Sequence, residues 1–286
     1  MSLTPTTLSQ TQIDQFISHG AVYIPGAISA DFAEHCAREM LGYMGIDEFD
    51  PSTWHARRAK PVNRGEPPPE QPENRYRYDI HAPRLWGAMC DLLGSDRLRP
   101  EKTFRSNGVY TLADPAVLAD PNPANRWLAP LPAEGRGGWH IDGSPEWFRH
   151  YLDSPQVALL VLIFFRDATR LGGATWYAPQ SVAWVARHYV NHPEGGGPSP
   201  QDIMARCTDL RVAEGRVGDA FLLHPFMMHS ASPSVLPQPR LMENDNISLI
   251  EPLNFDRPDP AQFSVLERSI LGALGVDRLQ FTRKSE

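Results

Sequence analysis

Residues 137 to 142 read Gly-Gly-Trp-His-Ile-Asp and place a histidine and a carboxylate two positions apart. If this stretch is a β-strand, its period of two points the side chains of His140 and Asp142 to the same face. Non-heme Fe(II) oxygenases hold their metal with two histidines and one carboxylate on one side of the iron. The third ligand must then come from elsewhere in the chain. By itself the pattern is weak, because a strand with a hydrogen-bonded histidine and a solvated aspartate looks the same.

Two histidines compete for the third position. Residues 218 to 230 read Gly-Asp-Ala-Phe-Leu-Leu-His-Pro-Phe-Met-Met-His-Ser, which predicts a turn followed by an apolar strand. His224 and His229 are five positions apart, so on an unbroken strand they would face opposite sides. Pro225 interrupts the strand and weakens that argument. Spacing alone therefore leaves both histidines as candidates.

Together these motifs resemble the phytanoyl-CoA dioxygenase (PhyH-like) superfamily of Fe(II)/2-oxoglutarate-dependent oxygenases. Members typically read Trp-His-x-Asp, then Gly-Asp with an apolar strand ending in His, then Arg about eleven residues on. Arg240 follows His229 by eleven positions here (240 − 229). Residues 171 to 181 resemble the Gly-rich strand of the family, and residues 20 to 29 resemble its N-terminal region. The resemblance extends from about residue 8 to about residue 255.

The resemblance implies a mainly β fold with flanking helices, a double-stranded β-helix of the jelly-roll, cupin-like kind. It implies that His140, Asp142 and His229 are the metal ligands and form the catalytic centre. His229 is favoured over His224 because the ligand of the family lies at the far end of this strand. His224 would then be a core residue or a neighbour of the ligands.

The resemblance also implies Fe(II) as the metal, with 2-oxoglutarate and O2 as cosubstrates. The far carboxylate of 2-oxoglutarate needs a buried cation, and Arg240 can grip it with two parallel hydrogen bonds. Thr175 is a further candidate through its hydroxyl group. We expect a strand over residues 102 to 111, which would contribute polar groups to the same pocket. Arg105, Asn107 and Tyr110 are the candidates on that strand.

Local patterns predict the remaining elements. Ser9 with Gln12, and Ser264 with Glu267, have the spacing of capping boxes at the start of two helices. Further helices are expected over residues 29–42, 83–93 and 181–189. Strands are expected over residues 21–24, 157–165, 174–178, 220–223 and 240–250, and the continuous apolar run at 157–165 indicates a strand that is buried on both faces.

We expect one domain over residues 1–286, because β-barrels of this length are often single domains. Residues 112–137 are rich in proline and glycine and lead into His140, so we interpret them as a lid over the site; an ordinary surface loop is the alternative. Residues 57–78 carry several arginines and are either a solvated loop or a site for an anionic group. His150 is either structural or part of a substrate site.

Composition limits the partners. The net charge is −7 and there is no long basic block, which disfavours nucleic acid and anionic membranes. Three scattered cysteines indicate reduced thiols in a cytoplasmic protein, and the chain contains no apolar run long enough for a transmembrane helix. We expect a small-molecule substrate and a monomer or homodimer.

The sequence favours a dioxygenase that hydroxylates, or oxidises in a related way, a small metabolite or natural-product intermediate. Related halogenases replace the carboxylate ligand with a small residue, so the intact Asp142 argues against halogenation. A Zn-dependent hydrolase is one alternative, because two histidines and a carboxylate also suit catalytic zinc. A non-catalytic cupin-like binding protein is another. No His-Glu-x-x-His motif supports the hydrolase.

Overall fold

Two antiparallel sheets lie face to face in the computed structural model, which describes residues 7–56, 74–106, 108–143 and 149–284. The larger sheet has the order β1-β8-β5-β10-β4, the smaller sheet has the order β7-β6-β9, and β2 pairs with β3 in a separate ribbon. The strands are β1 (Ala21–Ile24), β2 (Arg75–Arg77), β3 (Thr103–Arg105), β4 (Val109–Thr111), β5 (Leu159–Phe164), β6 (Thr175–Ala178), β7 (Arg211–Ala213), β8 (Ala220–Leu223), β9 (Met228–Ser230) and β10 (Arg240–Ile247).

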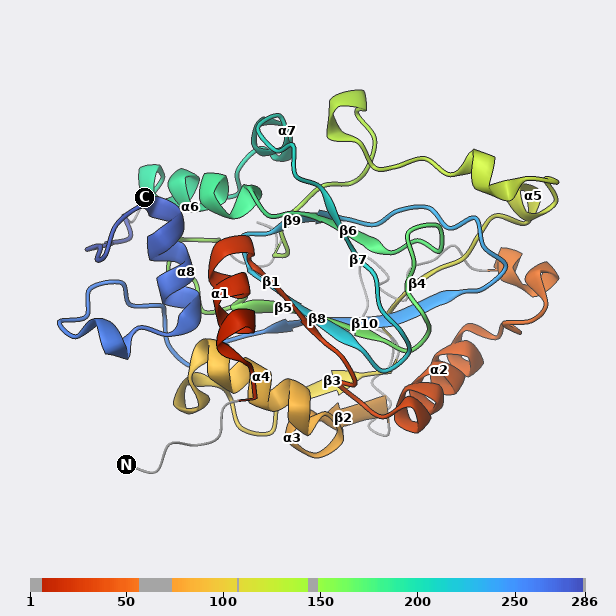
Figure 1. Ribbon diagram of the computed structural model, residues 1–286, viewed down its shortest axis with the longest axis horizontal. Coiled ribbons are helices and arrows are strands. Elements are labelled where there is room, and N and C mark those ends of the chain that lie inside the picture. Colours follow the sequence, from red (N-terminus) through yellow and green to blue (C-terminus); the bar gives the residue numbers. More distant parts are fainter. Residues whose placement is uncertain (1–6, 57–73, 107, 144–148, 285–286) are drawn as a thin grey trace.

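Helices cover the outside of this pair of sheets (Figure 1). They are α1 (Gln10–His19), α2 (Ala30–Met44), α3 (Tyr78–His81), α4 (Pro83–Leu93), α5 (Pro115–Leu118), α6 (Ser181–Asn191), α7 (Pro200–Met204) and α8 (Val265–Leu274). In the view of Figure 1, α2, α3 and α4 lie below the larger sheet, and α6 and α7 lie above it. The expected arrangement of antiparallel sheets with flanking helices is confirmed.

The core has two parts, and β5 separates them. All six residues of β5 are buried. Leu160, Leu162 and Phe164 pack between the two sheets, together with Phe221 of the neighbouring β8 and Tyr177 of β6 in the smaller sheet. The alternate residues of β5 pack against the helices. The alternation of a strand explains this division, and the predicted strand buried on both faces is confirmed.

Both predicted capping boxes are present. The Ser9 hydroxyl accepts from the backbone N–H of Gln12 at the start of α1, and the Gln12 side chain accepts in return from Ser9. Ser264 and Glu267 do the same at the start of α8. α1 ends at Gly20, whose φ of 68° is in the left-handed region that favours glycine.

Two strand predictions are wrong. The strand expected over residues 102–111 is divided between β3, which pairs with β2, and β4, which pairs with β10. Residues 137–142 do not form a strand, and only His140 makes an isolated bridge, to His229. Gly137 has a φ of 91°, which lies outside the range of an extended strand. The extended conformation is therefore interrupted shortly before His140.

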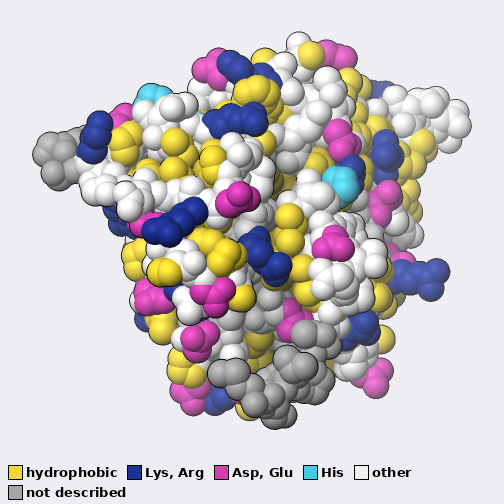
Figure 2. All heavy atoms as spheres, turned by 60° about the vertical axis from the view of Figure 1, so that its left-hand side comes forward, with side chains coloured by type: hydrophobic (Ala, Val, Ile, Leu, Met, Phe, Trp, Pro, Cys, Tyr) yellow, Lys and Arg dark blue, Asp and Glu magenta, His cyan; other side chains and the backbone are white. Residues whose placement is uncertain are grey.

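Charged side chains of both signs are interspersed on the face of the molecule in Figure 2, with hydrophobic groups between them. Among the described residues, no helix is long and apolar enough to cross a membrane. The three cysteines are free thiols.

Candidate metal and cosubstrate site

His140, Asp142 and His229 come together at one end of the barrel formed by the two sheets. His229 lies on β9, where it pairs with Tyr177 of β6 on one side and bridges His140 on the other. The backbones of His140 and His229 exchange two hydrogen bonds, of 3.1 and 2.9 Å. Candidate ligand atoms of the three residues all lie within 4.8 Å of one another. This backbone pairing places residues 89 positions apart (229 − 140) in one cluster.

Hydrogen bonds prepare both imidazoles to bind a metal through Nε2. Nδ1 of His140 lies 2.6 Å from the carbonyl oxygen of Gly138, and Nδ1 of His229 lies 3.1 Å from that of Met227. A carbonyl can only accept, so each Nδ1 must carry the proton and each Nε2 keeps its lone pair. Nε2 of His140 and of His229 lie 3.6 and 3.4 Å from Oδ1 of Asp142. The three donor groups therefore face a common point.

Asp142 is held as a carboxylate. Its burial disfavours the charged form, but hydrogen bonds and electrostatic attraction from His140 and His229 outweigh burial and keep the pKa of Asp142 well below its usual value. The backbone of Asp142 is also held: Nε2 of the buried His150 lies 2.9 Å from its carbonyl oxygen. His150 thus helps to fix the backbone position of Asp142, a candidate metal ligand. Sequence reasoning left its role open.

His224 lies apart from this cluster. Its ring packs against Phe226 and Phe16, and its Nδ1 accepts from the backbone N–H of Phe226 at 3.0 Å. Burial lowers the pKa of His224 to about 3, so the ring is neutral at physiological pH. Of the two histidines that the sequence left open, the structure brings only His229 to His140 and Asp142, and His224 lies in the core.

A buried arginine lies inside the barrel at some distance from the three residues. Arg240 begins β10 and is 4% exposed. Its two terminal nitrogens donate to the hydroxyl groups of Thr175, at 3.2 Å, and Thr111, at 2.7 Å. Neither partner is charged, and no carboxylate of the described residues forms an ion pair with Arg240. Burial lowers the pKa of Arg240 to about 10, which still leaves it protonated at neutral pH.

The strand directions place Arg240 and the three clustered residues along one axis. The turn after β5 leads into β6, so Thr175 starts β6 at the end of the barrel where Arg240 lies. Two residues further along β6, Tyr177 pairs with His229. Because a strand rises by about 3.3 Å per residue, this step moves roughly 7 Å along the barrel. An anion held at Arg240 would therefore extend toward His140, Asp142 and His229.

The structure places the other candidates as follows. Thr175 contacts Arg240 directly. Arg105 lies on β3, in the ribbon with β2 and not in the sheet that contains Arg240. Asn107 lies outside the described residues. Thr111 was missed by sequence reasoning, because only the pairing of β4 with β10 sets it directly opposite Arg240.

Residues 112–137 run across the top of Figure 1 from α5 toward α7. The Trp127 ring lies 5.9 Å from that of Trp176, and Nε1 of Trp139 donates to the carbonyl of Pro130. Residues 131–139 line a cavity of about 640 Å³ together with α7 and residues 207, 208 and 210. The end of residues 112–137 therefore lies beside α7 and leads directly into His140. The arginines expected near the start of residues 57–78 lie outside the described residues.

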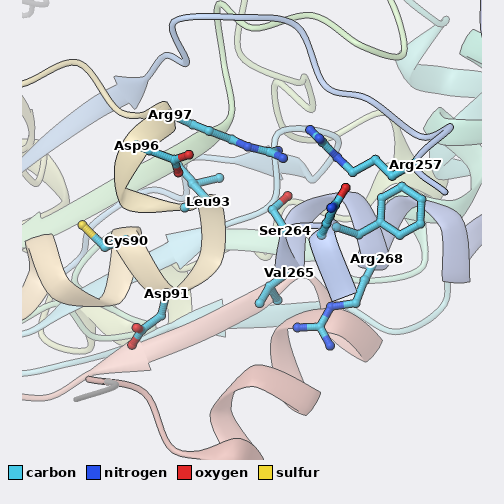
Figure 3. A pocket seen from close by; sticks show the side chains of 12 residues that line it. Cys90, Asp91, Leu93, Asp96, Arg97, Arg257, Ser264, Val265 and Arg268 are labelled. Atoms are coloured by element: carbon cyan, nitrogen blue, oxygen red, sulfur yellow. The ribbon is translucent and has the colours of Figure 1, made fainter. Parts of the chain in front are cut away.

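A second cavity, of about 430 Å³, lies between the end of α4 and the start of α8 (Figure 3). Arg97 and Arg257 reach toward one another over the start of α8, whereas Arg268 points to the other side. Glu267, which is fully buried, pairs with Arg97 at 2.8 Å and with Arg257 at 3.4 Å. The two cations share one buried carboxylate, so this junction joins elements of the fold.

No protein-family model and no curated protein matches the sequence. Among solved structures, the chain is similar to the non-heme alpha-ketoglutarate-dependent carbocyclase SnoK from nogalamycin biosynthesis, with a TM-score of 0.50, 13% identity and 86% of each chain covered. The chain shares the fold of that enzyme. The predicted double-stranded β-helix is confirmed, and at this identity the likeness concerns the fold.

Two further similar structures have slightly lower scores. EctD from S. alaskensis with bound Fe has a TM-score of 0.49 and 18% identity, over 85% of this chain and 77% of that chain. EvdO2 from Micromonospora carbonacea var. aurantiaca, complexed with 2-oxoglutarate, has a TM-score of 0.48 and 16% identity, over 92% of this chain and 99% of that chain.

Proposed function

We propose that the protein is an Fe(II)/2-oxoglutarate-dependent oxygenase that hydroxylates, or oxidises in a related way, a small organic molecule. The observation that carries the proposal is the buried Arg240, which has no carboxylate partner among the described residues and lies in the same barrel as a His-Asp-His cluster. A buried cation without a counter-charge is costly, so a bound anion would relieve the cost.

The donor set fits Fe(II). Two neutral imidazoles and one carboxylate on one face suit this metal and leave coordination positions open for other molecules. His140 and His229 would bind through Nε2, because backbone carbonyls hold both Nδ1 protons. When bound, the iron would supply the oxidation of the substrate by O2, linked to the oxidative decarboxylation of 2-oxoglutarate to succinate and CO2.

Arg240 would bind the far carboxylate of 2-oxoglutarate. Its guanidinium group is planar and can donate two parallel hydrogen bonds to a carboxylate. Thr111 and Thr175 hold the group in place from two different sheets. Its Nε is buried and has no partner among the described residues, so the guanidinium retains donor capacity for an anion. A zinc hydrolase could use the same three ligands, but its reaction would not explain why Arg240 is buried without a counter-charge.

We infer further that residues 1–286 act as one catalytic unit and that residues 112–137 gate the site. The substrate is a small molecule, not nucleic acid, since the net charge is −7. A non-catalytic binding protein with the same pocket would bind 2-oxoglutarate but would not release succinate.

The test is to add Fe(II) and 2-oxoglutarate under anaerobic conditions and to record the metal-to-ligand charge-transfer band, then to admit O2 and measure succinate. His229→Ala should abolish both signals, because it removes one of three metal ligands. His224→Ala is the matched control, five residues away and outside the cluster. It should leave metal binding largely intact. The assignment of ligands is wrong if His224→Ala loses the band and His229→Ala keeps it.

A further inference from the structure

The inward face of β10 carries two asparagines where a barrel interior would ordinarily be apolar. Asn244 pairs with Leu162 of β5, and Asn246 pairs with Leu160. Side chains directly opposite one another in an antiparallel pair lie on the same face of the sheet. Leu160 and Leu162 belong to the core between the two sheets. Asn244 and Asn246 therefore point into the barrel, on the same face of β10 as Arg240.

The two asparagines lie toward the clustered His140, Asp142 and His229. β10 starts at Arg240, opposite the start of β6, and both strands lead away from that end of the barrel. Tyr177 is the residue of β6 that lies directly opposite His229. Along β10, Asn244 and Asn246 come four and six residues after Arg240 (244 − 240 and 246 − 240). Both therefore lie further from Arg240 along the barrel than Met242 does. A molecule bound between the asparagines and the metal site would thus lie beyond the cosubstrate.

Neither asparagine has a structural role that the contacts explain. The side-chain oxygen of each is buried and has no hydrogen-bond partner among the described residues. The opposite face of the same strand differs: there Asp245 accepts from the Tyr78 hydroxyl at 2.9 Å and pairs with Lys102 at 3.1 Å. A buried polar atom without a partner costs on the order of 1–3 kcal/mol, so a partner from a bound molecule is expected.

We propose that Asn244 and Asn246 bind the substrate of the oxygenase proposed above, a neutral molecule with several hydroxyl groups, and orient it at the metal. A carboxamide carries no charge but offers an acceptor and two donors, which matches a hydroxyl group as donor and acceptor. Residues two apart on a strand are separated by roughly 6.6 Å, so the two amides would contact different groups on one small ring.

The test compares Asn244→Leu and Asn246→Leu with the wild-type enzyme, since leucine is of broadly similar size to asparagine but cannot hydrogen-bond. The probes are cyclitols and methyl glycosides, each paired with its cyclohexane or tetrahydropyran analogue without the hydroxyl groups. The readout is the succinate released above the rate without probe. Asn191→Leu is the control, because Asn191 is an exposed residue at the end of α6.

We expect hydroxylated probes to stimulate succinate release by the wild type and their analogues not to do so. Each leucine variant should weaken the apparent affinity for the stimulating probe about tenfold or more, which corresponds to about one lost hydrogen bond. The apparent affinity for the cosubstrate and the charge-transfer band should stay unchanged.

Three results would overturn the proposal while leaving the oxygenase assignment intact. These are stimulation by the analogues alone, no stimulation by any hydroxylated probe although the charge-transfer band forms, and leucine variants that behave like wild type. Absence of both the band and succinate in the wild type would instead contradict the proposed function itself.

Discussion

Arg240 shows how one residue can indicate the kind of ligand that a site binds. Its guanidinium group is buried and rests on two threonine hydroxyls, which hold its position without neutralising its charge. Its environment therefore favours a bound carboxylate.

Replacing Arg240 by alanine should weaken 2-oxoglutarate binding by a factor of about a hundred or more, because removing one partner of a buried ion pair costs on the order of 3–5 kcal/mol. Fe(II) binding should survive, since His140, Asp142 and His229 are untouched. Arg240→Lys should give an intermediate affinity, because it keeps the charge but loses the planar fork. The measurement is an anaerobic titration with 2-oxoglutarate followed by the charge-transfer band. Identical titrations of wild type and Arg240→Ala would mean that the anchor is another residue.

His224 should make the fold sensitive to acid. Its pKa is lowered by burial from 6.5 to about 3, so the unfolded chain binds a proton in this range and the folded chain does not. The free energy of unfolding should therefore fall as the pH drops from about 6.5 toward 3. His224→Asn keeps an acceptor for the N–H of Phe226 and should reduce this slope in urea unfolding at several pH values. His19→Asn, on α1, is the control and should keep the wild-type slope. Parallel slopes in all three proteins would contradict the assignment.

At the scale of the element, the two faces of β10 carry different side chains and have different surroundings. Arg240, Met242, Asn244 and Asn246 face the barrel, where the proposed chemistry takes place. Glu243 lies on the other face and is 5% exposed. Its Oε1 lies 3.4 Å from the backbone nitrogen of Arg105, and its Oε2 is buried without a partner among the described residues.

Glu243 should lower the stability of the folded protein as the pH rises from acidic to neutral values. Burial, and then the nearby charge of Asp245, raise the pKa of Glu243 from 4.5 to about 8. Between these values the folded chain holds a proton that the unfolded chain has lost. Stability should therefore fall as the pH rises from 4.5 to about 8. Glu243→Gln removes this titration and should be more stable than wild type near the upper end of the range.

The comparison of melting temperatures at several pH values checks the prediction for Glu243. Glu34→Gln, a more exposed carboxylate on α2 that pairs with Arg166, is the control, and it should not change the pH profile in the same way. The assignment fails if Glu243→Gln loses stability relative to wild type at every pH.

At the scale of the whole molecule, residues 112–137 connect β4 of the larger sheet to His140 beside the smaller one. The segment contains α5 and packs Trp127 on Trp176 near its end. Long segments of this composition over a site commonly gate it.

Hydrogen exchange should show the gating. We expect amides of residues 112–137 to exchange about tenfold more slowly once metal, 2-oxoglutarate and a stimulating probe are bound, because the segment would close over them. The turn at residues 94–97, which lies beside the start of α8, is the internal control. Equal protection with and without ligands would make residues 112–137 an ordinary surface segment.

The sequence by itself determined those features that depend on neighbours along the chain. Both capping boxes and the doubly buried β5 follow from local spacing and alternation. The resemblance also selected the residues that the structure brings together, His140, Asp142 and His229, because the motif keeps their types in order.

Only the tertiary structure decided features that depend on strands paired across long separations. Thr111 meets Arg240 across a separation of 129 positions (240 − 111), and Asn244 is turned inward by its register with Leu162. His140 needed no strand of its own, because one bridge to His229 sets its place. The pairing of distant strands is set by the packing of the whole chain, so no local pattern contains it. The division of β10 into a proposed binding face and a charged outer face follows from that packing.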